Sequence, residues 1–335
     1  MAKNNYKAWH IRSEDFSEEW PAVEKLRLFA RYAILAPSGH NTQPWRFTQD
    51  KQSLLLHADN SRSLPYSGVQ ANEPHVSLGC CLGVLELAAK GFGYSLAIDY
   101  HLSGDLVAAV RLSGKIAADP SLLEAITRRV SNRSLYDTAG LPDKLIQGFT
   151  KTTFKNVSTR TISKQSDISF IAEKTREATY RTFGDKEFRT ELSKWVRNNI
   201  TKQHDGMPGF VQGIPTPPSL FAKHIIKRLD VSKDQAKKDS SRILHSADLL
   251  LINVKDPGKE ALLNAGRLYA QICVLAQQQG IASSGLGTAI VDPEAKKEIA
   301  ESFRLDSQPI AIIRLGKTGR HARHTPRWPI SKVSG

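Results

Sequence analysis

The chain has 335 residues, of which 40% are hydrophobic and 24% are charged, and its formal net charge is +14. This composition is typical of a water-soluble globular protein, and the absence of any long apolar run excludes a chain that spans a membrane. The basic residues are spread along the sequence without interleaved aromatic residues, so they favour small anionic ligands and predict no nucleic-acid partner.

In the first part of the chain, helical and strand-like patterns alternate. Apolar residues three and four positions apart mark helices, and strict alternation marks half-buried strands. One segment, 36–47, fits neither pattern. The predicted elements are, in chain order, helix 21–35, strand 54–56, helix 74–90, strand 94–100 and strand 106–112.

After residue 120 the chain has more segments with helical periodicity than before it. The predicted elements are helices 122–130, 166–180 and 186–199, strand 249–254, helix 259–279, a short helix after Pro293 and strand 310–315. The segment 204–219 is rich in proline and glycine, which predicts a lid, a binding loop or a plain insertion. Both parts contain a long helix that ends at glycine, at Gly91 and at Gly280, so we predict two related halves, 1–120 and 121–335.

The segment 36–47 carries the densest group of specific residues. Two prolines and a tryptophan restrict its path, and a glycine exposes backbone without a side chain. Its hydroxyl and amide groups can both donate and accept hydrogen bonds, which suits the imide-like edge of a planar cofactor. The residues with these properties are Pro37, Ser38, Gly39, Asn41 and Gln43.

Three further segments have groups that suit an anionic ligand. Arg129, Ser131 and Arg133 lie within five residues at a helix end and suit a phosphate monoester. A second group, 283–288, has two glycines and three hydroxyls directly after a long helix. The third is the arginine-rich tail 320–329. A solvated helix end and a plain basic tail remain alternative interpretations of the first and third segments.

Other chemistries find little support in the sequence. The histidines are scattered, no Cys/His cluster has metal-ligand spacing, and no nucleophile motif is present, so we predict no catalytic side chain and no metal site. Cys80 and Cys81 are adjacent without redox spacing, which predicts buried thiols. With no secretory signal in residues 1–6, these features predict a cytoplasmic protein.

The loop Pro37-Ser38-x-x-Asn41-x-Gln43-Pro44-Trp45, together with these segments, resembles the nitroreductase family of FMN flavoproteins, in its tandem two-domain (Acg-like) branch. In ordinary members an R-x-S-x-R element precedes the loop, whereas here it follows the loop by about 90 residues. The resemblance therefore implies an α+β, nitroreductase-like fold whose two halves are fused as an intramolecular pseudo-dimer. Each half would have lost a different part of the flavin site.

The resemblance also assigns the site and implies one FMN per chain. The ring and ribityl groups would lie against Pro37, Ser38, Gly39, Asn41 and Gln43. The phosphate would be held by Arg129, Ser131, Arg133 and Arg327, and the pyrimidine side would face Gly287 and Thr288. Two choices stay open, Arg128 in place of Arg129 and Arg323 in place of Arg327.

By the same resemblance the chain would be an oxidoreductase. Hydride would pass from NAD(P)H through FMN to a nitroaromatic, quinone-like or similar small acceptor. The alternative is a protein that binds or sequesters FMN with little turnover, its flavin covered by the segment 204–219. No nucleic acid and no membrane are expected as partners, and a monomer is possible because the pseudo-dimer is internal.

Overall fold

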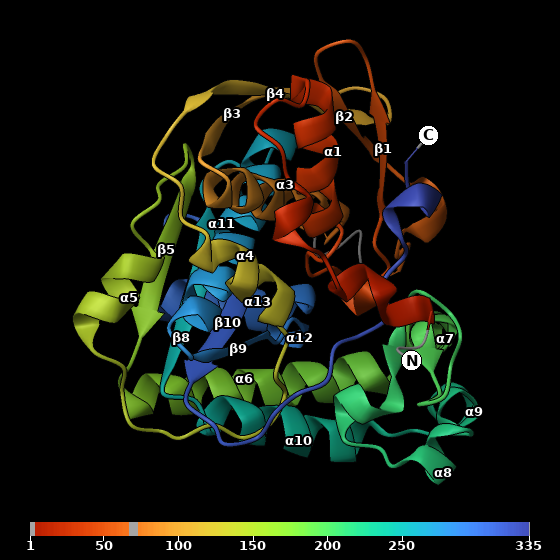
Figure 1. Cartoon of the computed structure of the whole chain (residues 1–335). Coiled ribbons are helices and arrows are strands. Elements are labelled where there is room, and N and C mark those ends of the chain that lie inside the picture. The colour runs from red at the N-terminus through yellow and green to blue at the C-terminus, as the bar shows by residue number, and fades with distance from the viewer. Residues whose placement is uncertain (1–3, 67–72, 335) are drawn as a thin grey trace.

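The computed structural model describes residues 4–66 and 73–334, which contain two four-stranded antiparallel sheets (Figure 1). The strands of the first sheet, in the order β1-β2-β4-β3, are β1 (Trp45–Gln49), β2 (Leu54–Ala58), β3 (Tyr94–Tyr100) and β4 (Leu106–Lys115). Those of the second sheet, in the order β5-β8-β10-β9, are β5 (Val157–Ile162), β8 (Asp248–Val254), β9 (Ala282–Gly285) and β10 (Gln308–Gly316). Because the helices are not regular crossovers between parallel strands, the fold is α+β, as predicted.

Helices fill the space between the sheets and cover the outer face of the second sheet (Figure 1). The inner layer consists of α1 (Ala22–Ala33), α3 (Glu73–Gly91), α4 (Ser121–Arg128), α5 (Asp143–Phe149) and α11 (Lys259–Gln278). The outer layer consists of α6 (Gln165–Gly184), α10 (Ser232–Leu244), α12 (Thr288–Val291) and α13 (Pro293–Ser302).

The strand β8 is buried along its full length because both faces of its sheet are covered. Leu250 and Ile252 pack into the apolar cluster on the α11 side, and Leu249 and Leu251 pack into the cluster on the α6 side. Alternate side chains therefore enter two different cores, which explains why residues 249–252 form a continuous apolar run in the sequence.

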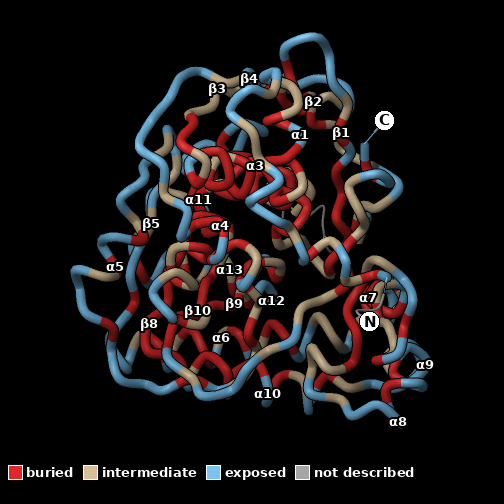
Figure 2. Tube along the Cα trace, in the orientation of Figure 1, coloured by how far each residue is buried: buried red, intermediate tan, exposed pale blue. Residues whose placement is uncertain are grey.

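The helices α3 and α11 cross at the centre of the molecule, where the trace is mostly buried (Figure 2). Their closest approach is made by glycines. A Cβ atom on Gly79 would lie 2.0 Å from the carbonyl oxygen of Leu263, and a Cβ atom on Gly266 would lie 2.0 Å from that of Val76. Only glycine fits at these two positions, since the obstructing atoms belong to backbone.

A separate small unit, which we call the cap (residues 186–229), lies beside the two-sheet body, at the lower right of Figure 1. It consists of α7 (Lys186–Trp195), β6 (Val196–Arg197), β7 (Met207–Pro208), α8 (Thr216–Ser219) and α9 (Ala222–Arg228). Its own apolar cluster contains Phe188, Leu192, Val196, Met207 and Ala222. The predicted loop 204–219 is thus built from β7, a 3-10 helix (Gly209–Gln212) and α8.

Most predicted helices and strands are confirmed, with boundaries shifted by a few residues. The helix predicted over 186–199 ends at Trp195, because the chain becomes extended from Val196 onward. The strands β1, β5 and β9 and the helices α5, α9 and α10 were not predicted, since these short or polar segments show no clear periodicity. The residues 1–3 of the N-terminal segment lie outside the described residues.

The division at residue 120 stays a prediction. The strands of the first sheet precede it and those of the second sheet follow it. However, α4 follows residue 120 and still packs into the core of the first sheet. The C-terminal tail also returns to the first sheet, where the Phe47 amide donates a hydrogen bond to the Val333 carbonyl at 2.6 Å.

Candidate functional site

The loop between α1 and β1 has an unusual backbone. His40, Asn41 and Gln43 have φ angles of 47°, 59° and 56°, which lie in the left-handed region that residues other than glycine seldom adopt. Such conformations cost about 1–3 kcal/mol each and persist only where the surroundings hold them. The Ser38 hydroxyl contributes by accepting a hydrogen bond from the Gln43 amide at 3.0 Å.

Two side-chain amides tie this loop to distant segments. The Asn41 side chain donates to the carbonyls of Gly206 at 2.9 Å and Pro326 at 3.0 Å. The Gln43 side chain donates to the His204 carbonyl at 2.8 Å and accepts from the Trp328 amide at 3.0 Å. The loop is therefore fastened both to the cap and to the C-terminal tail.

Arg327 also holds the loop in place, through hydrogen bonds from a buried guanidinium. Its guanidinium is buried and donates to the carbonyl oxygens of Leu35 and Ala36 at 3.3 and 3.2 Å, and to the Asn41 side-chain oxygen. It also lies 4.9 Å from the centre of the Trp9 ring. Among the nitrogens of this guanidinium, only Nε has no acceptor in the described residues. The expected phosphate ligand is thus placed as a tether of the loop.

Replacing Arg327 with alanine should destabilise the flavin-free protein by about 2–4 kcal/mol, because several buried acceptors would lose their donor. Arg323→Ala is the control, since its exposed guanidinium only stacks on Phe210 at 4.2 Å; we expect a loss below about 1 kcal/mol. Chemical denaturation without added FMN measures both. An unchanged flavin-free protein that loses FMN affinity would instead make Arg327 a phosphate ligand.

Two adjoining cavities open beside the loop, one polar of about 330 Å³ and one largely apolar of about 340 Å³. Their shared wall contains residues from the loop, the second sheet region and the cap. These shared residues are Pro37, Ser38, His40, Ser131, Arg133, Met207, Gln212 and Arg242. The predicted loop and the predicted R-x-S-x-R segment therefore meet at one place in the fold.

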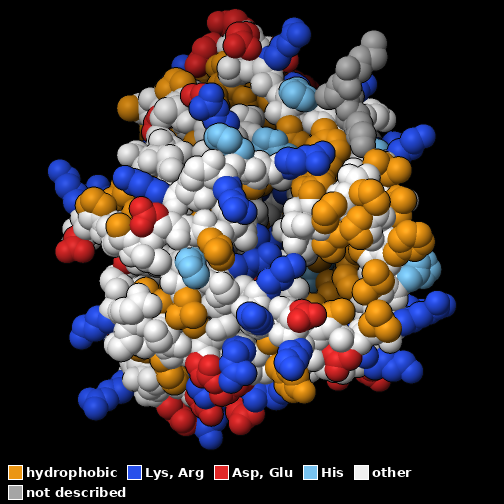
Figure 3. All heavy atoms as spheres, turned by 90° about the horizontal axis from the view of Figure 1, so that it is seen from below, with side chains coloured by type: hydrophobic (Ala, Val, Ile, Leu, Met, Phe, Trp, Pro, Cys, Tyr) orange, Lys and Arg blue, Asp and Glu red, His pale blue; other side chains and the backbone are white. Residues whose placement is uncertain are grey.

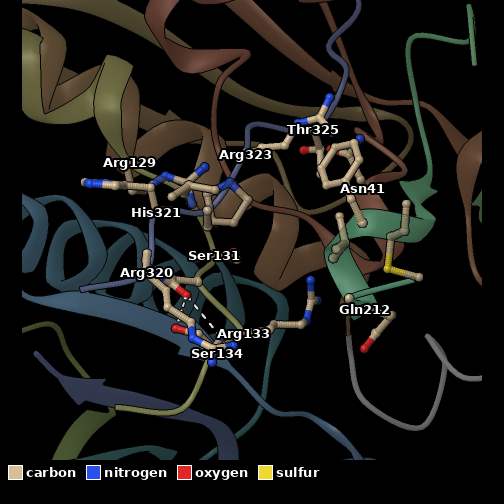
Figure 4. Close-up of a pocket in the computed structure, with 18 of the residues that line it drawn as sticks. Asn41, Arg129, Ser131, Arg133, Ser134, Gln212, Arg320, His321, Arg323 and Thr325 are labelled. Atoms are coloured by element: carbon tan, nitrogen blue, oxygen red, sulfur yellow. Dashed lines mark hydrogen bonds between the residues drawn. The ribbon is translucent and has the colours of Figure 1, made fainter. Parts of the chain in front are cut away.

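The polar cavity is strongly cationic (Figure 4). No aspartate or glutamate occurs among the described residues that line it. The lining arginines are Arg129, Arg133, Arg242, Arg320, Arg323 and Arg327. In a space-filling view from below, Lys and Arg side chains surround a hollow near the centre of the molecule (Figure 3). This charge distribution suits a ligand with an anionic group.

The arginines differ in what they already bind. Arg242 pairs with Asp239 at 2.8 Å, and Arg129 donates one hydrogen bond to the Leu35 carbonyl at 2.9 Å. Arg133 is half-buried, and its guanidinium has no hydrogen bond or ion pair with any described residue. Burial, together with the neighbouring Arg242, lowers the pKa of Arg133. The carboxylate of Asp239 acts in the opposite direction on this pKa, but it forms its ion pair with Arg242. Arg133 is therefore a cation without an ion pair of its own among the described residues, and an anionic ligand would stabilise it.

The backbone of this segment is fixed against the second sheet. Ser131 forms a parallel bridge with Ser283 of β9, and the Asn132 amide donates to the Ser283 carbonyl at 3.0 Å. This attachment directs Arg133 into the space between the cavities, on the side of Gln212 (Figure 4). Arg128 is exposed and pairs with Glu124 at 2.9 Å outside both cavities, whereas Arg129 lines the polar cavity.

The apolar cavity is bounded by close backbone as well as side chains. Gly39, Gly287 and Thr288 line it, and a Cβ atom on Gly287 would meet nothing within 4 Å, so its backbone faces open space. Gln43 differs from expectation, because it is fully buried outside both cavities and its amide is used for tethering. Asn41 does line the polar cavity, but its side-chain atoms are all bonded within the protein.

Two titratable side chains face the cavities without having been predicted as site residues. Burial lowers the pKa of His40 to about 4, so its ring is neutral at pH 7, and its buried Nδ1 has no hydrogen-bond partner in the part of the chain that the structure describes. Burial raises the pKa of Glu73, whose carboxylate accepts from the Gly39 amide at 2.5 Å and from the Ser77 hydroxyl. Arg242 was also not predicted as a site residue, since α10 has no clear sequence signal. Glu73 stands at the start of a predicted helix, where an acidic residue is common, so its position gave no sign of a role in the site.

Comparison with known proteins gives relatives of similar length, although no protein-family model matches the chain. "Putative NAD(P)H nitroreductase Rv3131" of Mycobacterium tuberculosis is 24% identical over 94% of this chain and 91% of its own. "Probable NAD(P)H nitroreductase PigM" of a Serratia species is 23% identical over 88% of this chain and 89% of its own.

Among solved structures, a nitroreductase with bound FMN from Desulfitobacterium hafniense is similar to 62% of this chain and 94% of that chain. The identity is 12% and the TM-score 0.41. A nitroreductase with bound FMN from Bacteroides fragilis is similar to 62% of this chain and 93% of that chain, with 14% identity and a TM-score of 0.39. Every helix in residues 4–66 and 73–334 is too short or too polar to cross a membrane.

Proposed function

Because the chain is a nitroreductase-family protein, we propose that it is an oxidoreductase that binds FMN and uses NAD(P)H to reduce a nitroaromatic, quinone-like or similar small acceptor. The observation that carries this proposal is the position of Arg133. It is an unpaired cation at the junction of an arginine-lined cavity and an apolar cavity bounded by glycine backbone. An elongated ligand with a phosphate at one end and a flat ring system at the other has this complementary character.

The residues present fit FMN in both chemistry and arrangement. Arg129, Ser131 and Arg133 would hold the phosphate, and the exposed Arg323 lies at the same cavity. The ring system would lie in the apolar cavity against Pro37, Ser38, Gly39, Gly287 and Thr288. In this arrangement FMN is not held directly by Arg327, Asn41 and Gln43. These residues act through the loop, by holding its backbone in the left-handed conformation.

When bound, FMN supplies the hydride chemistry, so few side chains of the chain need to act as acids or bases. Glu73 positions Gly39 through the amide hydrogen bond and keeps the loop against α3. The neutral His40 ring lines both cavities, and its Nδ1 can donate or accept one hydrogen bond, depending on the tautomer. The apolar cap side chains Phe188, Leu192 and Met207 exclude water from the apolar cavity.

We further propose that the chain is an intramolecular pseudo-dimer with halves 1–120 and 121–335. When the strands are numbered within each four-stranded sheet, both sheets have the order 1-2-4-3. The crossing of α3 and α11 is also reciprocal: Gly79 approaches the residue three before Gly266, and Gly266 approaches the residue three before Gly79. Such reciprocity is the mark of a twofold interface, and it supports one complete site per chain in a monomer.

A second candidate function is FMN sequestration. It is favoured by one observation, that cap residues from Met207 to Ile214 form a wall of both cavities. A cap that stays closed over the site would block NAD(P)H and acceptor, whereas a cap that opens would be a gate. The two candidates therefore differ in whether the cap moves during turnover.

The side chain of Asn199 offers a way to loosen the cap without touching the cavities. It donates to the Ile214 carbonyl at 2.9 Å and accepts from the Phe210 amide at 2.7 Å. Asn199→Ala should favour opening of this segment by about 2 kcal/mol. Asn198→Ala is the matched control, because its side chain only accepts from the exposed Ile200 amide.

We expect NAD(P)H oxidation with a quinone or nitroaromatic acceptor in the unmodified protein, and at most a few-fold change in Asn199→Ala. Steady-state assays of the FMN-loaded proteins measure this. Turnover that appears only in Asn199→Ala would support sequestration. No turnover in any of the three proteins would overturn the enzyme proposal.

A further inference from the structure

The outer face of α9 carries a stripe of large apolar side chains. Ile225 lies within α9, whereas Phe221 directly precedes the helix and Leu229 directly follows it with an extended backbone, so the three are spaced four residues apart along the segment. Their exposed fractions are 63%, 39% and 58%, and the preceding Leu220 is 46% exposed. Single exposed apolar residues are ordinary, but a continuous group marks an interaction site. In Figure 3 hydrophobic side chains gather on the right, the side on which α8 and α9 lie in Figure 1.

Unpaired cations accompany this stripe on the same short helix. Lys223, Lys227 and Arg228 are exposed, and none of them has an ion pair or hydrogen bond with any residue that the structure describes. The fold therefore makes no use of their charge. They alternate with the apolar side chains along the helix, as in helices that lie at the surface of an anionic membrane.

The inner face of α9 is what holds the helix in place. Ala222 packs in the cap cluster with Phe188 and Leu192, and Ile226 packs against that cluster and lines the apolar cavity. The outer stripe contributes nothing to this packing. Its hydrophobic surface is thus not covered by any residue that the structure describes, and it can contact a partner outside the protein.

We propose that the outer face of α9 docks the protein onto the surface of an anionic lipid bilayer. Phosphate headgroups would pair with Lys223, Lys227 and Arg228, while Phe221, Ile225 and Leu229 would enter the headgroup boundary. A nucleic acid would pair with the cations but would leave the apolar side chains exposed to water. A second copy of this chain would bring like charges together across a twofold interface, in a protein whose net charge is already +14.

This proposal is independent of the proposed redox function. It departs from the expectation of a chain without a membrane partner, since a peripheral surface needs no spanning segment.

The test is sedimentation of the full FMN-loaded chain with vesicles of phosphatidylglycerol mixed with phosphatidylcholine, and with vesicles of phosphatidylcholine alone. We expect binding to the anionic vesicles and little to the neutral ones. Lys223→Gln/Lys227→Gln should bind the anionic vesicles about 25-fold more weakly, because each basic residue at an anionic surface contributes about a fivefold factor. Phe221→Ser/Leu229→Ser should lose at least about tenfold.

Matched controls carry the same substitutions on other exposed surfaces. Lys144→Gln/Lys151→Gln removes two charges elsewhere, and Leu102→Ser/Ile116→Ser removes side chains that are 45% and 44% exposed. Both should bind as the unmodified protein does. No binding to anionic vesicles, or equal losses in the controls, would overturn the proposal. Equal binding to neutral vesicles, or a dimer that Phe221→Ser/Leu229→Ser dissociates, would also overturn it.

Discussion

Arg133→Ala should weaken FMN binding by roughly 10- to 100-fold, the effect of losing a charge-assisted hydrogen bond to phosphate. The stability of the flavin-free protein should not fall. Arg133 has no hydrogen bond or ion pair to lose within residues 4–66 and 73–334, and removal of a half-buried cation next to Arg242 relieves repulsion. Fluorescence titration of the flavin-free protein with FMN, with parallel denaturation curves, measures the two effects separately.

The control for this experiment is Arg128→Ala, five residues away on the same segment. Its guanidinium is exposed and pairs with Glu124, so FMN affinity should be unchanged. The unmodified protein should show flavin absorption bands and bind one FMN per chain. An Arg133→Ala variant with full affinity would refute the phosphate assignment, and two FMN per chain would refute the fused pseudo-dimer.

Gly266→Ala should destabilise the protein by about 3 kcal/mol or more. The added methyl group would overlap the Val76 carbonyl oxygen, a backbone atom that cannot rotate away, so α3 and α11 must separate. Helix propensity acts in the opposite direction, since alanine is favoured over glycine by about 1 kcal/mol. A loss in the free energy of unfolding would therefore show that close packing at the helix crossing outweighs helix propensity.

Gly148→Ala in α5 is the matched control, because a Cβ atom there would meet nothing within 4 Å. We expect it to be neutral or to stabilise by up to about 1 kcal/mol. Urea denaturation compares the two variants. A Gly266→Ala protein as stable as the control would mean that the helices can move apart freely.

This crossing matters for the site as well as for stability. The first turn of α3 carries Glu73 and Ser77, which hold Gly39, and α11 carries Tyr269, whose ring lies under Gly285. Separation of the two helices would widen the apolar cavity between these residues. We therefore expect Gly266→Ala also to weaken FMN binding, which the same titration measures.

Several elements could be predicted because their signal is local. The apolar run 249–252 in β8 predicted a buried strand, and the regular spacing in α1 and α11 predicted helices. The cap could not be predicted in this way. Its segment 206–212 has no periodicity. It is held by the distant Asn41, which donates to the Gly206 carbonyl, and by Asn199 within the cap, which accepts from the Phe210 amide.

The sequence by itself determined the kinds of residue that meet at the site: the Pro37–Trp45 loop, the Arg129–Arg133 segment and the arginines of the tail. Only the tertiary structure decided what each of them does. Arg327 and Arg133 are the same residue type, yet Arg327 is surrounded by the carbonyls of Leu35 and Ala36, whereas Arg133 meets none. Helical and strand patterns arise from residues that are neighbours in the sequence. Whether an arginine is available to bind a ligand depends instead on which hydrogen-bond acceptors the folded chain brings near its guanidinium.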